Sequence, residues 1–144
     1  MTSRLLWLLA AVLLAGGTYL LTQSGQHTPE TANPSSDGVT MVDVTLPAEL
    51  TEQQSLGKQA FEGNCATCHG ENAGGLVGKG PPLIHKIYEP SHHGDGAFLM
   101  AARQGVRAHH WKFGDMPPVE GLTNSDIENI VAYVRAVQRE NGIN

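Results

Sequence analysis

The chain has 144 residues, of which 40% are hydrophobic and 16% charged, with a formal net charge of −5 and two cysteines. This length suits one modest domain, and the negative charge argues against a nucleic-acid-binding protein. The same charge favours partners that have a basic docking face.

The first 22 residues are expected to be a signal-anchor or a signal peptide. Residues 5–21 form an almost unbroken apolar run behind Arg4, and polar residues follow. The run is short for a membrane-spanning helix but long for the core of a signal peptide, and no strong cleavage site ends it, so an anchor is favoured. We therefore expect an N-terminal hydrophobic helix. The rest of the chain would then lie on the periplasmic side of a bacterial inner membrane, or free in the periplasm if the leader is cleaved.

The next segment, residues 23–46, is rich in Ser, Thr, Pro, Gly and Asn and has few large apolar side chains. Such a composition predicts a flexible tether. The folded domain is expected to occupy residues 47–144.

A first helix is expected from about Glu52 to Asn64. Thr51 and Gln54 have the spacing of a capping box. Apolar residues then recur at helical spacing, namely Leu56, Ala60 and Phe61. Gly57 lowers the helix propensity of this segment, so another backbone is expected to approach it closely.

Both cysteines follow directly, in the sequence Cys65-Ala66-Thr67-Cys68-His69. This C-x-x-C-H motif is typical of covalent c-type haem attachment, in which the two thiols bond to the porphyrin and His69 is the proximal iron ligand. A thioredoxin-type pair would need a βαβ pattern, and a zinc site would need further ligands at fixed spacing. A disulfide across two residues would constrain little. One haem c is therefore the expected cofactor, with a thiol-redox or structural role as the alternative.

Two more helices are expected after a Gly-rich loop. Asp95 is a candidate cap for a middle helix that ends at Gly105, and residues 106–121 look irregular. Thr123 and Asp126 form a second capping box. The last helix then carries an apolar stripe, Ile127, Ile130, Val131, Val134 and Val137. The sequence has no strand pattern, so the domain is expected to be all-α.

Together these features resemble the class I c-type cytochromes. The shared features are the capped helix with Gly57 and Phe61, the C-x-x-C-H motif, a Gly-Pro-x-Leu segment at 80–83, a Met-Pro pair at Met116 and a last helix bearing Tyr133. The resemblance covers about residues 47–144. It implies a small helical domain around one covalently bound haem, in which Gly57 and Phe61 of the first helix cross Ile130 and Tyr133 of the last.

Met116 is the expected sixth ligand of the haem iron, opposite His69. It lies in a proline-rich loop shortly before the last helix, where the family places its ligand, and a methionine thioether stabilises ferrous iron. The other candidates are Met1, Met41, Met100, His109 and His110. The first two precede the domain and the third suits a helix core, whereas the two histidines stay open as rival ligands.

Further haem contacts are implied by the resemblance. His69 is expected to donate its other ring N–H to the carbonyl of Pro81, and Leu83 is expected to pack on the haem. Trp111 either hydrogen-bonds a haem propionate or covers the haem edge. The segment between the two iron ligands also holds five histidines, which are either ordinary surface residues or part of a transition-metal site: His85, His92, His93, His109 and His110.

The expected function is electron transfer by a membrane-tethered mono-haem cytochrome that cycles between Fe(III) and Fe(II). Its partners would be respiratory redox proteins, with no small-molecule substrate and no nucleic acid. We expect no enzyme activity of its own, although the chain can be a subunit of a larger oxidoreductase. The alternative is a haem enzyme or a gas or redox sensor whose sixth ligand position is open or labile.

Overall fold

The computed structural model describes residues 38–144. The predicted signal segment and most of the predicted tether lie outside these residues. The elements are α2 (Glu52–Asn64), α3 (Ala66–His69), η1 (Lys86–Tyr88), α4 (Asp95–Gln104) and α5 (Asn124–Glu140). Within residues 38–144, strand pairing is limited to isolated β-bridges, which confirms the expected all-α fold. In this part of the chain no helix is both long enough and apolar enough to cross a membrane.

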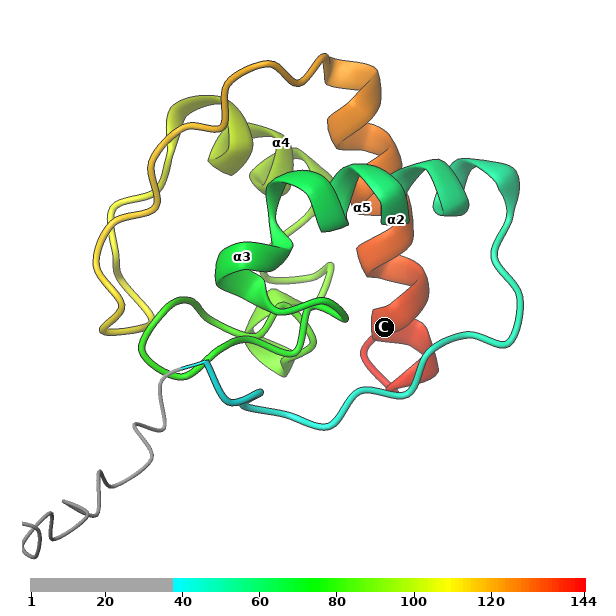
Figure 1. The fold of residues 1–144 in the computed structure, drawn as a ribbon, viewed down its shortest axis with the longest axis horizontal. Helices are drawn as coiled ribbons and strands as arrows, with labels where there is room; N and C mark the ends of the chain where they lie inside the picture. The colour runs from blue at the N-terminus through cyan, green and yellow to red at the C-terminus, as the bar shows by residue number, and fades with distance from the viewer. Residues whose placement is uncertain (1–37) are drawn as a thin grey trace, which may run out of the picture. The chain divides into compact units, whose positions relative to one another are not determined.

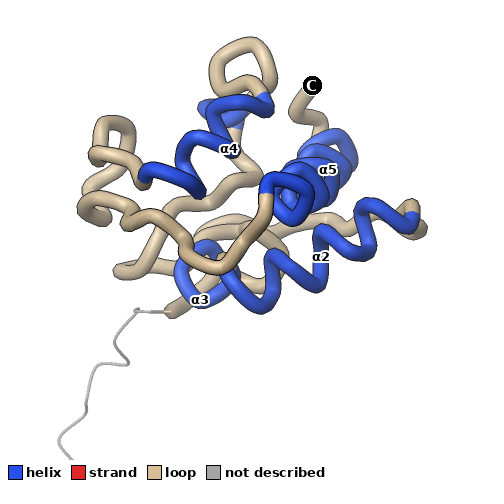
Figure 2. The backbone as a smooth tube through the Cα atoms, turned by 90° about the horizontal axis from the view of Figure 1, so that it is seen from above, coloured by secondary structure: helices blue, strands red, loops and turns tan. Residues whose placement is uncertain are grey.

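Helices α2 and α5 cross at the centre of the domain, as Figures 1 and 2 show. A Cβ atom placed on Gly57 would lie 1.8 Å from the backbone oxygen of Asn129, so only glycine allows the two backbones to come this close. Beside this contact, the rings of Phe61 and Tyr133 pack with centroids 5.7 Å apart. The close approach expected at Gly57 is therefore confirmed.

Both predicted capping boxes are present. At the start of α2, the Thr51 N–H donates to the Gln54 side chain at 3.0 Å; at the start of α5, the Thr123 N–H donates to Asp126 at 2.8 Å. The apolar stripe of α5 is buried throughout. Leu56 differs from expectation: it was placed on the apolar face of α2, but it is 49% exposed.

Helix α4 begins differently from the prediction. Gly94 is its N-cap, without a capping side chain, and Asp95 is its first residue. The Asp95 carboxylate instead accepts a hydrogen bond of 2.8 Å from Nε of Arg135 on α5, because the loop before α4 brings it beside that guanidinium. The helix ends before Gly105, which has a φ of +74°, as expected for a glycine that terminates a helix.

The predicted tether extends too far into the domain. Residues 38–46 lie against the Gly-rich loop, where the N–H groups of Met41 and Val42 donate to Gly75 and Gly74 at 3.2 and 3.1 Å. Thr45 and Asn141 also exchange hydrogen bonds, at 3.0 and 2.7 Å. The compact unit accordingly begins well before residue 47. Local polar composition did not reveal these contacts, because they form with distant parts of the chain.

Candidate functional site

An apolar cavity of about 490 Å³ lies beside the α2–α5 crossing. Its volume falls within the range of small-molecule and cofactor sites, roughly 300–1,000 Å³. All seven residues that the sequence analysis assigned to the haem line this one cavity: Cys65, Cys68, His69, Pro81, Leu83, Trp111 and Met116. The remaining wall is largely apolar and comes from α2, η1, α4, α5 and the loops on either side of α4.

The C-x-x-C-H motif forms the short helix α3, which the sequence analysis did not predict as a separate element. Cys65 ends α2 by donating its N–H to Phe61 O at 2.8 Å, and it starts α3 by accepting from the N–H groups of Cys68 and His69 at 3.2 and 2.9 Å. This single turn brings both thiols and the imidazole to the same cavity. Two thioether bonds and one axial ligand can therefore be supplied from one short segment.

The protonation state of Cys65 argues against a thiol-redox role. Burial, with a smaller contribution from neighbouring Cys68, raises the pKa of Cys65 to about 11. Redox-active cysteine pairs have a lowered thiol pKa, since the thiolate is the reactive form. A covalent link to a cofactor fits this environment better than disulfide exchange does.

His69 is held in the orientation and tautomer that an iron ligand needs. Its Nδ1 lies 2.9 Å from the carbonyl oxygen of Pro81. Because a carbonyl can only accept, Nδ1 carries the proton and Nε2 keeps its lone pair. Burial lowers the pKa of His69, although the Pro81 hydrogen bond opposes this shift. The ring is therefore favoured in the neutral form that binds metals.

Met116, in the loop between α4 and α5, is fixed in the cavity wall by its backbone. Its N–H donates to Val106 O and its carbonyl accepts from Val106 N–H, both at 2.9 Å. Gly105 makes this pairing possible, because a Cβ there would lie 2.5 Å from Met116 O. The loop is closed further by Ala108 N–H, which donates to Asp115 at 2.8 Å. The thioether is thus held at the cavity, on a tied loop that is followed by two prolines.

Trp111 provides a polar atom that fits a carboxylate of the cofactor. Its indole Nε1 is buried and makes no hydrogen bond of normal geometry within residues 38–144, although Tyr88 is close by. A buried donor without an acceptor is costly. A haem propionate would satisfy it, so the residues present fit the group that the motif implies.

The rival histidines also lie at the cavity. His109 and His110 line it and are exposed to solvent, whereas Met116 is half-buried. His85 packs its ring edge against Trp111, with centroids 5.2 Å apart. The structure thus brings both kinds of candidate sixth ligand to the same cavity.

Two supporting residues, Arg135 and Gln138, were missed by the sequence analysis. Gln138 donates to Leu83 O at 2.8 Å, and Arg135 donates to Tyr88 O at 2.7 Å, so both tie the segment after the Gly-rich loop to α5. A detectable signal was that both polar side chains fall on the buried stripe of α5, three residues apart.

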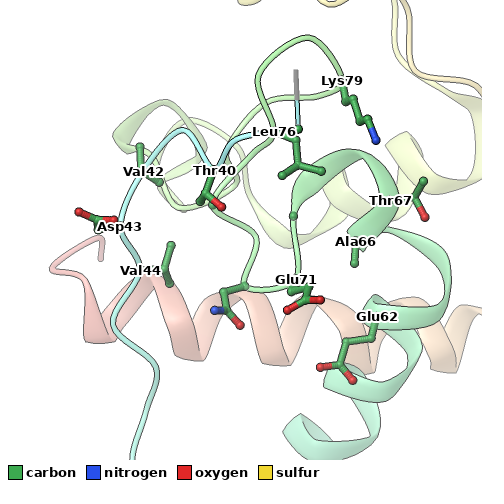
Figure 3. A pocket seen from close by; sticks show the side chains of 14 residues that line it. Thr40, Val42, Asp43, Val44, Glu62, Ala66, Thr67, Glu71, Leu76 and Lys79 are labelled. Carbon is green, nitrogen blue, oxygen red and sulfur yellow. The ribbon is translucent and has the colours of Figure 1, made fainter. Parts of the chain in front are cut away.

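A second hollow, of about 900 Å³, borders α3 (Figure 3). Its lining includes three acidic residues and one lysine: Asp43, Glu62, Glu71 and Lys79. Neither cysteine lines it, and no histidine of the described chain does. It therefore does not fit the haem, but it places negative charge beside the C-x-x-C-H turn.

Comparison with known proteins agrees with this site. The family described as Cytochrome c matches residues 54–138. A curated relative from Rubrivivax gelatinosus, the CcoP subunit of a cbb3-type cytochrome c oxidase, is 29% identical over 126 residues. The match covers 82% of this chain but 39% of the relative, so the chain spans well under half the length of that protein.

Proposed function

The chain belongs to the cytochrome c family, and from this premise we propose that it is a membrane-tethered electron carrier whose haem iron is ligated by His69 and Met116. The family carries covalently attached haem c, for which Cys65 and Cys68 have the required spacing. When bound, the haem supplies the one-electron Fe(III)/Fe(II) couple. The observation that carries the proposal is the single cavity shared by the C-x-x-C-H turn and Met116.

Within this proposal the chain positions, tunes and insulates the cofactor. The Pro81 carbonyl orients His69 while burial favours its neutral form. The paired backbone of Met116 holds the thioether in place, and Trp111 would meet a propionate. The apolar wall would keep water from the iron, which favours the ferrous form. With His69 and Met116 both bound to the iron, no position would remain for an exogenous ligand, so the role would be electron transfer rather than bond chemistry.

We propose respiratory redox proteins as partners and the exported face of a bacterial inner membrane as the location. The relative is a subunit of a cbb3-type cytochrome c oxidase, which supports a place in a respiratory pathway. The apolar run at residues 5–21 supports export and anchoring. A tethered carrier would have a high effective concentration near membrane-bound partners.

We further propose that the partner docks with a basic face near α3. Cys68 and Thr67 are exposed there, beside the acidic lining of the second hollow. Glu62 is paired with Lys58, whereas Glu71 makes no ion pair within residues 38–144. Redox encounters are small and depend on charge complementarity, so Glu71 is expected to contribute to docking.

The test uses two inorganic oxidants of opposite charge on the reduced holoprotein. At low salt, Glu71→Lys should lower the ratio of cationic-reagent to anionic-reagent rates by roughly threefold. The matched control, Glu140→Lys at the end of α5, makes the same charge change and should affect the ratio less. If the two variants changed the rate ratio equally, only the net charge of the protein would matter. The proposal that the partner docks near α3 would then be wrong.

A second candidate function rests on the position of His109. Because this side chain lines the same cavity, it could act as a distal base in a haem enzyme, or replace methionine in a sensor with a labile sixth ligand. This alternative predicts rapid carbon monoxide binding by the reduced protein, whereas a six-coordinate carrier does not react.

A further inference from the structure

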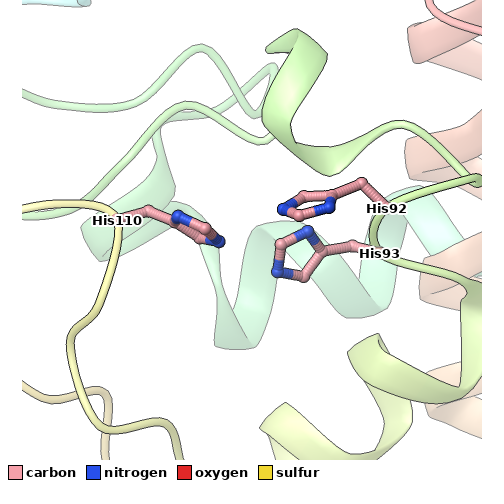
Figure 4. A group of neighbouring side chains, drawn as sticks. All are labelled: His92, His93 and His110. Carbon is pink, nitrogen blue, oxygen red and sulfur yellow. The ribbon is translucent and has the colours of Figure 1, made fainter.

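Three histidines from two separate loops converge beside the haem cavity, and two of them, His93 and His110, line it. His92 and His93 lie in the loop before α4, and His110 lies in the loop after it. One ring nitrogen from each can be chosen so that all lie within 4.8 Å of one another, and Figure 4 shows the three rings grouped together. The ring centroids are 4.7 Å apart for His92 and His93 and 5.1 Å apart for His93 and His110.

His93 is held in place by its surroundings. Its Nδ1 lies 2.6 Å from Ile87 O, and since a carbonyl can only accept, Nδ1 is protonated and Nε2 keeps its lone pair. The buried Arg135 donates to the backbone oxygen of His93 and, at 2.7 Å, to that of Tyr88. A carbonyl bonded to the far nitrogen of a histidine is the usual support of a metal ligand.

The loop that carries His92 and His93 is also tied by its backbone. Both N–H groups donate to Glu89 O, at 3.0 and 2.8 Å. Asp95, directly after the loop, accepts from Arg135 at 2.8 Å. The backbone of the loop is thus fixed at both ends, so the histidine side chains can move mainly by rotation of their rings.

The other two rings have unused nitrogen atoms. Neither the His92 nor the His110 side chain makes a hydrogen bond within residues 38–144, and both are exposed. Each ring therefore has a nitrogen free to bind a transition-metal ion.

We propose that His92, His93 and His110 bind one divalent late transition-metal ion, of the copper or zinc type, through three imidazole nitrogens. Such ions favour imidazole ligands. At a metal–nitrogen distance of about 2.0–2.1 Å, nitrogens in a tetrahedral site lie roughly 3.3 Å apart. Rotation of the two exposed rings closes the remaining gap, and water completes the coordination.

This site would join two loops of the domain. His110 belongs to the segment that Val106 and Met116 close with paired 2.9 Å hydrogen bonds, while His93 is anchored to α5 through Arg135. A bound ion would therefore clamp the Met116 loop against the loop before α4. The expected consequence is a higher Tm in the presence of the metal, because the ion binds only the folded arrangement.

The test uses full-chain holoprotein without a histidine tag, stripped with a chelator and then titrated separately with Zn(II) and Cu(II) against a competing chromophoric chelator. We expect one equivalent of either ion per chain. Each of His92→Gln, His93→Gln and His110→Gln should weaken binding by roughly tenfold or more, since even outer-shell partners have effects of 10- to 100-fold. His27→Gln, the matched control, should bind as the wild type does.

Two results would overturn the proposal: less than one equivalent of metal bound, or binding that the three variants leave unchanged. The haem absorption spectrum of each variant shows whether it is folded. A second measurement needs no variant: zinc-edge X-ray absorption of the zinc-loaded holoprotein should show three imidazoles around the ion. A shell of oxygen atoms alone would also contradict the site.

Discussion

Replacing Gly57 with alanine tests the crossing of α2 and α5 on which the cavity depends. The new Cβ would lie 1.8 Å from the oxygen and 2.4 Å from the carbonyl carbon of Asn129, far inside the carbon contact distance of about 3.5–4.0 Å. Backbone atoms cannot rotate away, so the helices must move apart and loosen the Phe61–Tyr133 contact. Overpacking of this kind costs about 3 kcal/mol, the upper end of the usual range.

Alanine also improves helix propensity by about 1 kcal/mol relative to glycine, so the expected net loss of unfolding free energy is about 2 kcal/mol. Gly63→Ala is the matched control. It lies in the same helix, and nothing is within 4 Å of its added Cβ, so it should gain about 0.5–1 kcal/mol. The two variants should therefore differ by roughly 3 kcal/mol.

The assay is guanidinium unfolding of the oxidised holoprotein, followed by far-UV circular dichroism. Because the haem is covalently attached, unfolding does not release it. In a parallel thermal unfolding experiment, a net loss of about 2 kcal/mol would lower the Tm by roughly 8–16 °C in a domain of this size. If Gly57→Ala were as stable as Gly63→Ala, the close backbone approach would be wrong.

Two further predictions concern polar contacts. The Arg135 guanidinium donates to Asp95, to Tyr88 O and, at 2.6 Å, to the side-chain oxygen of Gln138. Arg135→Lys keeps the charge but cannot make these three hydrogen bonds together, so chemical unfolding should show a loss of about 2–3 kcal/mol; an unchanged midpoint would refute the role of the guanidinium. Hydrogen bonds from Thr123 hold the pKa of Asp126 below its usual 3.8. The resulting stabilisation is present above pH 3.8 and is lost as pH falls through the lower folded-state pKa. The measurement is the free energy of unfolding from pH 7 to pH 2. Asp126→Asn should not show the part of the stability loss at low pH that comes from protonation of Asp126. If wild type and variant lost stability identically with falling pH, the assignment to Asp126 would be contradicted.

The elements that could be predicted from sequence depend on local signals. The capping boxes at Thr51 and Thr123 fix where α2 and α5 begin, because a side chain and a backbone N–H only three residues apart satisfy each other. The C-x-x-C-H motif can also be recognised from sequence alone, because all of its reactive side chains lie within one helical turn. The resemblance to a family added the pairing of Gly57 and Phe61 with α5, which no local signal contains.

The features that could not be predicted depend on tertiary contacts. Asp95 has the right position and residue type for a helix cap, but its carboxylate instead accepts a hydrogen bond from Arg135, 40 residues away in the sequence. Residues 38–46 look like linker in composition, yet residues 38–42 pair with the Gly-rich loop through backbone groups that every residue carries. Of the three histidines of the metal-site proposal, only His92 and His93 are adjacent along the chain, and the fold alone brings His110 to them.

The central claim, that His69 and Met116 ligate a haem used for electron transfer, is tested most directly by optical spectroscopy. Spectra of oxidised and reduced holoprotein, with and without carbon monoxide, are compared for wild type, Met116→Ala and the control Met41→Ala. We predict that wild type and control show a ferric sulfur-to-iron band and do not react with carbon monoxide, while Met116→Ala loses the band and binds the gas. A Met116→Ala protein that keeps the wild-type spectrum, or a wild type that binds carbon monoxide readily, would contradict the account.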